Sequence, residues 1–269
     1  MISFRDKIKY GPSFRSARVE ERELRLPSSC AAAAGRTLLF LSDVHLSSRF
    51  PESAVNHLLD QIQALQPDMI LLGGDYGESA AWQQQFFELF ARLTPPLGAY
   101  GVLGNNDCEC FPKNQKPLIQ IAEKAGVRLL VDEKLRIAVG GGAISVAGLD
   151  EYKQAAALKN PLFSDEDESA FRILLSHYPQ SSGRYIRKES GLMPHLAMAG
   201  HTHGGQFRLL GLTPYSIGYE LDIRRYMTAV SGWKKVGETD FLVSPGLGTS
   251  RVPYRLNIEP TIHLLRLTR

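Results

Sequence analysis

The stretch that decides the fold is TLLFLSDVH, residues 37–45, in which an apolar run ends at an aspartate and a histidine two positions apart. A continuous apolar run of this length is typical of a strand that is buried on both faces. Residues 51–66 follow with apolar side chains at helical spacing, which predicts an amphipathic helix. A strand, a polar motif and a helix in this order indicate one unit of an α/β fold.

The same unit occurs twice more along the first half of the chain. Each copy has an apolar strand, a polar motif and a helix: residues 68–72, 73–75 and 79–93 in one copy, and residues 99–103, 104–107 and 116–125 in the other. Polar motifs that follow the carboxyl ends of strands lie where open α/β sheets bind their ligands. The first half therefore predicts a ligand site at one edge of a parallel sheet.

From residue 127 onward the pattern changes to mostly strands, and the first three of them, separated by glycine breaks, are expected to form an antiparallel meander. The predicted strands cover residues 128–131, 135–139, 143–147, 171–175, 196–199, 227–230, 241–244 and 261–267. Two of them end at polar motifs, Ser176-His177-Tyr178-Pro179 and Gly200-His201-Thr202-His203. Because no linker rich in proline, glycine or serine divides the chain, we expect a single domain over residues 37–269, preceded by a basic arm over residues 1–36.

The composition is that of an ordinary globular protein, with 43% hydrophobic and 22% charged residues and a net charge of +3. Residues 1–36 carry eight basic side chains against four acidic ones. We expect a solvated lead-in strand there, with contact to an anionic membrane surface as the alternative. Three cysteines favour a reducing compartment, and neither a signal peptide nor a spanning segment is evident. The expected location is cytoplasmic, with a peripheral place on the inner membrane face as the alternative.

The strand ends collect seven side chains that commonly bind metals: two carboxylates, one amide and four imidazoles. They are Asp43, His45, Asp75, Asn105, His177, His201 and His203. This mixed nitrogen and oxygen set suits borderline divalent ions, with Mn²⁺ favoured over Fe²⁺, Zn²⁺, Co²⁺ or Ni²⁺. Seven ligands are too many for one tetrahedral ion but suit two ions that share a carboxylate.

These motifs, in this order, resemble the five motifs of the calcineurin-like metallophosphoesterases. Residues 199–206 and 246–257 also resemble the YkuE/YaeI-like phosphodiesterase branch of that family. The resemblance implies a four-layer α/β-β/α sandwich of two mixed sheets flanked by helices. It also implies a metal-dependent hydrolase of phosphoric esters or phosphoanhydrides, in which a hydroxide bridging two metal ions attacks phosphorus.

The resemblance further implies a role for each ligand residue. The first ion is expected on Asp43, His45 and His203, and the second on Asn105, His177 and His201. Asp75 is expected to bridge the two ions. Asn106 and Asp107, which complete the motif after the third strand, are expected to be catalytic residues near the substrate phosphate.

Asn106 departs from the family pattern, which usually has a histidine there that can protonate the leaving oxygen. An amide cannot transfer a proton, so we hypothesise a small-molecule phosphodiester or pyrophosphate with a good leaving group. A nucleotide-diphospho-sugar lipid such as UDP-2,3-diacylglucosamine is one such substrate. The alternative is a metal-binding module in which hydrolysis is lost or weak.

Other features leave several interpretations open. Residues 207–235 mix aromatic, aliphatic and basic side chains, which would suit a wall for a lipid-linked substrate, a peripheral membrane contact or ordinary hairpin packing. Arg255 is a candidate phosphate contact, and Cys108 and Cys110 are candidate ligands or oxidation targets. Nucleic acid is not an expected partner, because no basic groove with stacked aromatics is apparent outside residues 207–235.

Overall fold

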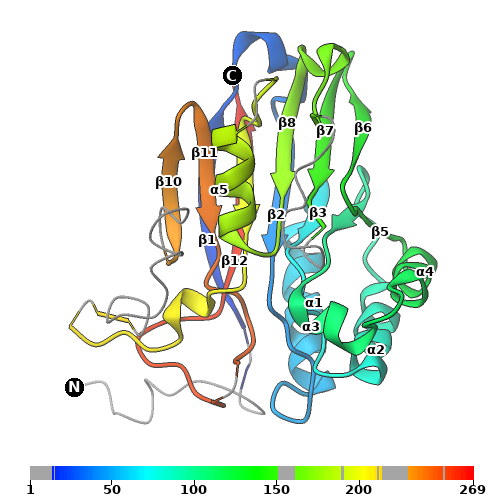
Figure 1. The fold of residues 1–269 in the computed structure, drawn as a ribbon, viewed down its shortest axis with the longest axis vertical. Coiled ribbons are helices and arrows are strands. Elements are labelled where there is room, and N and C mark those ends of the chain that lie inside the picture. The colour runs from blue at the N-terminus through cyan, green and yellow to red at the C-terminus, as the bar shows by residue number, and fades with distance from the viewer. Residues whose placement is uncertain are drawn as a thin grey trace.

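Two six-stranded sheets form the centre of the fold (Figure 1). The computed structural model describes residues 14, 16–150, 161–188, 191–210, 212–213, 230–250 and 252–269. The first sheet contains, in spatial order, β1 (Arg18–Arg25), β12 (Thr261–Thr268), β2 (Thr37–Leu41), β3 (Met69–Leu72), β4 (Ala99–Gly101) and β5 (Val127–Leu129). The second contains β10 (Gly232–Val236), β11 (Thr239–Val243), β9 (Leu196–Ala199), β8 (Ala170–Leu175), β7 (Gly142–Gly148) and β6 (Glu133–Val139).

Helices cover the outer face of each sheet, as Figure 1 shows. The helices associated with the first sheet are α1 (Glu52–Leu65), α2 (Ala80–Phe90), α3 (Asn105–Cys110) and α4 (Lys116–Lys124), and α5 (Pro179–Lys188) lies against the second. Short 3-10 turns are η2 (Ser28–Ala33), η3 (Asp165–Asp167) and η4 (His203–Gly205). This arrangement confirms the predicted α/β sandwich of two mixed sheets flanked by helices. In the described part of the chain, no helix has the length and apolar character needed to cross a membrane.

The apolar run of β2 is explained by burial on both of its faces. Leu38 and Phe40 lie in the core between the two sheets, whereas Leu39 and Leu41 lie in the core between the first sheet and its helices. Successive side chains of a strand point to opposite faces, so only a strand covered on both sides is apolar at every position. The run therefore places β2 at the centre of the layered structure.

The predicted antiparallel meander after residue 127 is wrong. β5 pairs in parallel with β4 in the first sheet, and β7 pairs in parallel with β8 in the second. Of the three strands β5, β6 and β7, only β6 and β7 form an antiparallel pair, joined at Gly140 and Gly141, which both have positive φ. β5 instead continues the strand–helix–strand pattern after α4, and such crossovers give parallel pairs.

Several elements do not follow from the sequence pattern. Residues 18–25 of the basic arm form β1, which pairs in parallel with β12 from Arg18–Thr261 to Arg25–Thr268. A lead-in strand is expected in this arm, but its charged side chains give no sign of its partner strand, because β1 lies at an edge of its sheet. The short polar helix α3, the helix α5 and the strand β10 also lack a strong apolar repeat. The strand predicted over residues 227–230 lies, except for Val230, outside the described residues.

Candidate metal centre

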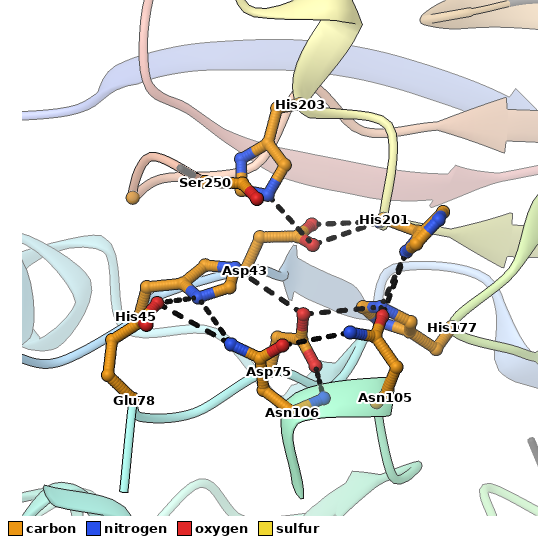
Figure 2. Close-up of polar contacts among 12 residues, drawn as sticks. Asp43, His45, Asp75, Glu78, Asn105, Asn106, His177, His201, His203 and Ser250 are labelled. Atoms are coloured by element: carbon orange, nitrogen blue, oxygen red, sulfur yellow. Dashed lines mark hydrogen bonds and ion pairs between the residues drawn. The ribbon is translucent and has the colours of Figure 1, made fainter. Parts of the chain in front are cut away.

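The seven predicted ligands lie shortly after the ends of five strands from both sheets, in loops or at the start of the helix or turn that follows. Asp43 and His45 follow β2, Asp75 follows β3, Asn105 follows β4, His177 follows β8, and His201 and His203 follow β9. Figure 2 shows their side chains converging on one place. The structure therefore brings together all the residues that the strand-end pattern selects.

Left-handed backbone turns direct these side chains into the site. The five ligand residues with positive φ, between 49° and 70°, are Asp43, His45, Asp75, His201 and His203. Aspartate and histidine adopt this conformation more readily than most residues, but it still costs about 1–3 kcal/mol at each position. Backbone strain at several ligand residues indicates that the fold tolerates this cost in order to place their side chains in the site.

Two glycines let the backbone pass close behind the aspartates. A Cβ atom at Gly104 would collide with Asp75 Oδ1, and one at Gly200 would collide with Asp43 Oδ2. Any side chain there would displace a carboxylate. The glycines that precede Asn105 and His201 are thus part of the construction of the site.

The first ligand group consists of Asp43, His45 and His203. One ligand atom from each lies within 4.8 Å of the others, and His203 Nε2 is 3.8 Å from Asp43 Oδ1. The Asp43 carboxylate also accepts hydrogen bonds from the backbone N–H of His201 at 2.9 and 3.1 Å. Asp43 therefore ties the loop after β2 to the loop after β9.

The second ligand group consists of Asn105, His177 and His201. Asn105 Oδ1 lies 3.1 Å from His177 Nε2 and 3.0 Å from His201 Nδ1, and the two imidazole nitrogens are 3.2 Å apart. The structure also places Asp43 with Asp75 and His177 in a common cluster. Asp43 thus contacts both groups, which the sequence does not indicate.

Asp75 lies between the two groups. Its Oδ2 atom is 3.4 Å from His45 Nε2 and 3.4 Å from His177 Nε2, and its Oδ1 atom accepts the backbone N–H of Asn106 at 2.9 Å. One carboxylate oxygen therefore faces an imidazole of each group. This is the place that a carboxylate shared by two ions would need to occupy.

The electrostatics of the site suit the binding of positively charged metal ions. Burial alone would raise the pKa of Asp75, but His177, His45 and backbone hydrogen bonding outweigh it and lower the pKa. Burial works against a charged His177, yet Asp75 raises the pKa of His177 to about 10. His45 Nε2 is buried, with no hydrogen-bond partner in the described part of the chain. Two buried carboxylates and an unbonded imidazole nitrogen form a donor set that divalent cations would complete.

Asn106 and Asp107, the predicted catalytic residues, lie in different surroundings. Asp107 is fully buried, and its carboxylate accepts the backbone N–H groups of Gly104, Asp75 and Tyr76 at 2.8, 2.8 and 3.1 Å. Burial, with Asp75 nearby, raises the pKa of Asp107 to about 7. Asp107 therefore joins two ligand loops from behind, while the Asn106 amide lies beside ligand side chains.

Glu78 is a neighbour of the centre that the sequence pattern does not select. Its Oε1 atom is 2.6 Å from His45 Nδ1. The only signal for it in the sequence is a carboxylate three residues after Asp75, and that position does not follow a strand directly. Carboxylates commonly hold ligand histidines in this way.

Arg255 has a different environment from the expected phosphate contact. It is buried, donates to Gly248 O and Pro245 O, and lies with Nη2 3.2 Å from His203 Nδ1. The guanidinium therefore supports the loop behind His203. Cys108 is part of the apolar core, and neither it nor Cys110 belongs to the ligand groups found in the described residues.

Comparison with known proteins assigns the chain to a family. The family model described as calcineurin-like phosphoesterase matches residues 36–205. YpbG of Bacillus subtilis is 30% identical over 232 residues, which cover 86% of this chain and 80% of that protein. Phosphodiesterase YaeI of Escherichia coli is 28% identical (87% and 83% covered), and metallophosphoesterase YkuE of Bacillus subtilis is 26% identical (87% and 79% covered).

The matched residues contain every predicted ligand, and the family model covers more than half of the chain. The ordered ligand motifs, the layered fold and this match agree. The chain belongs to the calcineurin-like phosphoesterases, a family of phosphoester hydrolases that use divalent metal ions.

Proposed function

We propose that this chain hydrolyses phosphodiesters or pyrophosphates with two divalent ions, Mn²⁺ being favoured. The supporting observation is the pair of ligand groups on either side of Asp75, which contacts an imidazole of each. Asp43, His45 and His203 would hold one ion, Asn105, His177 and His201 the other, and Asp75 would bridge them. Two ions held side by side by these groups would activate a water for attack on phosphorus and offset the negative charge on the phosphoryl group.

The leaving group of the substrate is the next part of the proposal. Asn106 stands where the family usually has a histidine. Its amide can donate a hydrogen bond but is too weak an acid to transfer a proton to a leaving oxygen. General acid catalysis contributes about 10²–10⁴-fold, most of it with leaving groups that are poor as anions. A phosphoanhydride or an aryl-type ester needs little such help, so we assign the chain to substrates with good leaving groups.

A lipid-linked substrate is the finer form of this proposal. The exposed large apolar residues in the described part of the chain gather in two segments: Leu209, Leu210 and Leu212 in one, Val252 and Tyr254 in the other. Gln206 joins the segments, because its Nε2 atom donates to Val252 O and Tyr254 O. An apolar surface that begins six residues after His203 would suit the acyl chain of a diphospho-sugar lipid and a place at the inner membrane face.

A leaving-group series tests the proposal directly. The full chain with Mn²⁺ would be assayed on bis-p-nitrophenyl phosphate, a nucleotide-diphospho-sugar and alkyl phosphomonoesters of graded leaving-group pKa. We expect kcat/KM to fall steeply as the leaving-group pKa rises. Equal turnover of alkyl monoesters and pyrophosphates would contradict the leaving-group assignment.

The variant N106H sharpens this test, because it restores a group that can carry a proton. At saturating Mn²⁺ it should raise turnover of the poorest leaving groups relative to the best, by up to about 10²-fold. The ratio of the two rates removes any general effect of the variant on folding or metal content. An unchanged ratio would argue that Asn106 does not explain the preference.

The second candidate function is a metal-binding module without hydrolysis. Asn106 favours it, whereas the complete set of seven ligands favours an enzyme. Metal binding without metal-dependent turnover of bis-p-nitrophenyl phosphate, in the wild-type chain, would support the module.

A further inference from the structure

Glu78 and Asn106 form a layer of side chains behind the predicted ligands (Figure 2). Glu78 Oε1 is 2.6 Å from His45 Nδ1 and 3.5 Å from Asn106 Nδ2. Asn106 Oδ1 accepts a hydrogen bond from Asn105 Nδ2 at 2.8 Å. The layer therefore extends from a ligand of the first group to a ligand of the second.

The contact with Glu78 fixes which nitrogen of His45 faces the centre. A carboxylate can only accept, so His45 Nδ1 donates its hydrogen to Glu78 Oε1 at 2.6 Å. The Asn106 Nδ2 donor, 3.2 Å from the same nitrogen, then forms no hydrogen bond with it. His45 Nε2, which faces Asp75, is then left with its lone pair toward the centre. A carboxylate behind an imidazole also makes the ring a better metal ligand, and removing such a partner costs roughly 10–100-fold in metal affinity.

The contact with Asn106 does the same for Asn105. Because Asn105 Nδ2 donates to Asn106 Oδ1, the Asn105 carbonyl oxygen is turned toward His177 and His201. Asn106 is itself held by the fully buried Gln83, whose Nε2 donates to Asn106 O at 3.3 Å. The backbone N–H of Asn106 donates to Asp75 Oδ1. The backbone of Asn106 is thus held at both its carbonyl and its N–H group, which places the side-chain amide at the edge of the centre.

We infer that Glu78 and Asn106 are positioning residues, Glu78 for the ligand His45 and Asn106 for the ligand Asn105, and that they set the affinity of the two ion sites separately. The residue that replaces the usual proton donor thus has a structural task in metal binding. This inference rests on the two-ion centre of the proposed function, but it does not depend on which ester is hydrolysed.

Co²⁺ titration of the chelator-treated full chain tests the inference, followed by calorimetry and by the visible absorption of the bound ion. We expect E78A to weaken one binding step and N106A the other, each roughly 10–100-fold. E78Q, which keeps an acceptor for His45 but lacks the charge, should fall between E78A and the wild type. E109Q is the matched control, since Glu109 is exposed on the same short helix as Asn106, and it should bind Co²⁺ as the wild type does.

Wild-type affinity at both steps in either E78A or N106A would overturn the inference. Equal weakening of both steps, together with a lower midpoint of thermal unfolding in the metal-free variants, would also overturn it, because the residues would then serve only the fold. A wild-type chain that binds no Co²⁺ would overturn both this inference and the proposed function. A wild-type chain that binds two ions without hydrolysing any ester would contradict only the proposed function.

Discussion

The two ligand groups differ in what lies behind their side chains. In the first group, charged residues stand behind the imidazoles, with Glu78 behind His45 and Arg255 behind His203. In the second group, the His177 ring contacts the backbone carbonyl of Gly73 at 2.8 Å, and Asn105 contacts another amide. Hydrogen bonds to charged groups are the stronger kind. The first group is therefore supported by charged side chains, whereas the second is supported by a main-chain carbonyl behind His177 and a neutral amide behind Asn105.

This difference implies that the two ion sites can be changed independently. The supports of the first group come from residues distant in sequence, and substitution there leaves the strand ends in place. The main-chain support of His177 cannot be removed by a side-chain substitution, whereas the Asn106 amide that supports Asn105 can be. Variants should therefore separate the groups unless they alter Asp75 or Asp43, each of which contacts both.

D75N should have the largest effect, because it removes the charge that both groups share. Bound ions stabilise the transition state by several kcal/mol, and D75N should weaken the binding of both ions. We therefore expect kcat/KM to fall by about 10³-fold or more. Metal analysis after dialysis should show loss of both ions. D60N is the control, since Asp60 lies on the surface in a pair with Arg92. Retention of one full equivalent of metal by D75N would contradict a shared carboxylate.

The strand-end ligands could be predicted from the sequence because two local rules coincide there. A fully apolar run marks a strand buried on both faces, and parallel strands in a layered fold bring their carboxyl ends to one edge. Asp43, Asp75 and Asn105 follow such runs directly. Their convergence therefore needs no knowledge of distant contacts.

The supporting residues could not be predicted because their roles depend on long-range packing. Arg255 reaches His203 across the tail of the chain, and its charge alone suggests a surface contact with phosphate. The same limit applies to β1, whose mostly charged side chains give no sign that the strand pairs with β12 at the far end of the chain. The local sequence pattern thus predicts which side chains enter the site, whereas only the three-dimensional fold shows which residues support those side chains.

R255M should have the next largest effect and should act on the first group alone. It leaves the buried carbonyl of Gly248 without its charged donor, at a cost of about 1–3 kcal/mol, and removes the donor to the half-buried carbonyl of Pro245. Urea unfolding would measure this loss, and metal titration should show weaker binding at one step only. R266M is the control, since Arg266 forms an exposed pair with Glu21 that is worth about 0–1 kcal/mol. Equal destabilisation by both variants, or weakening of both metal sites, would contradict the assignment of Arg255 to the first group.

A buried histidine supports the first group from the core between the sheets. His263 Nε2 lies 3.1 Å from Ser244 Oγ, and this hydroxyl accepts the backbone N–H of Gly246 at 3.0 Å. Gly246 packs directly behind Asp43, where an added Cβ would lie 2.7 Å from Asp43 Cβ. Burial, with a smaller contribution from Arg18, lowers the pKa of His263 to about 3.

The stability of the wild type should therefore fall in acid more than that of H263Q, in which glutamine can keep the contact with Ser244. Unfolded His263 takes up a proton near pH 6.5, whereas the folded protein resists it until about pH 3. The contribution of the neutral ring is complete above pH 6.5 and declines by about 1.4 kcal/mol per pH unit below it, so the wild type should lose about 2 kcal/mol more than H263Q between pH 7 and pH 5. Urea unfolding of both chains with chelator measures this difference, because the other titrating groups cancel. The exposed His57 gives the control H57Q, whose stability should follow that of the wild type across this pH range. Parallel pH profiles of stability for the wild type and H263Q would contradict the prediction, because they would show that the buried ring already carries its proton in the folded protein.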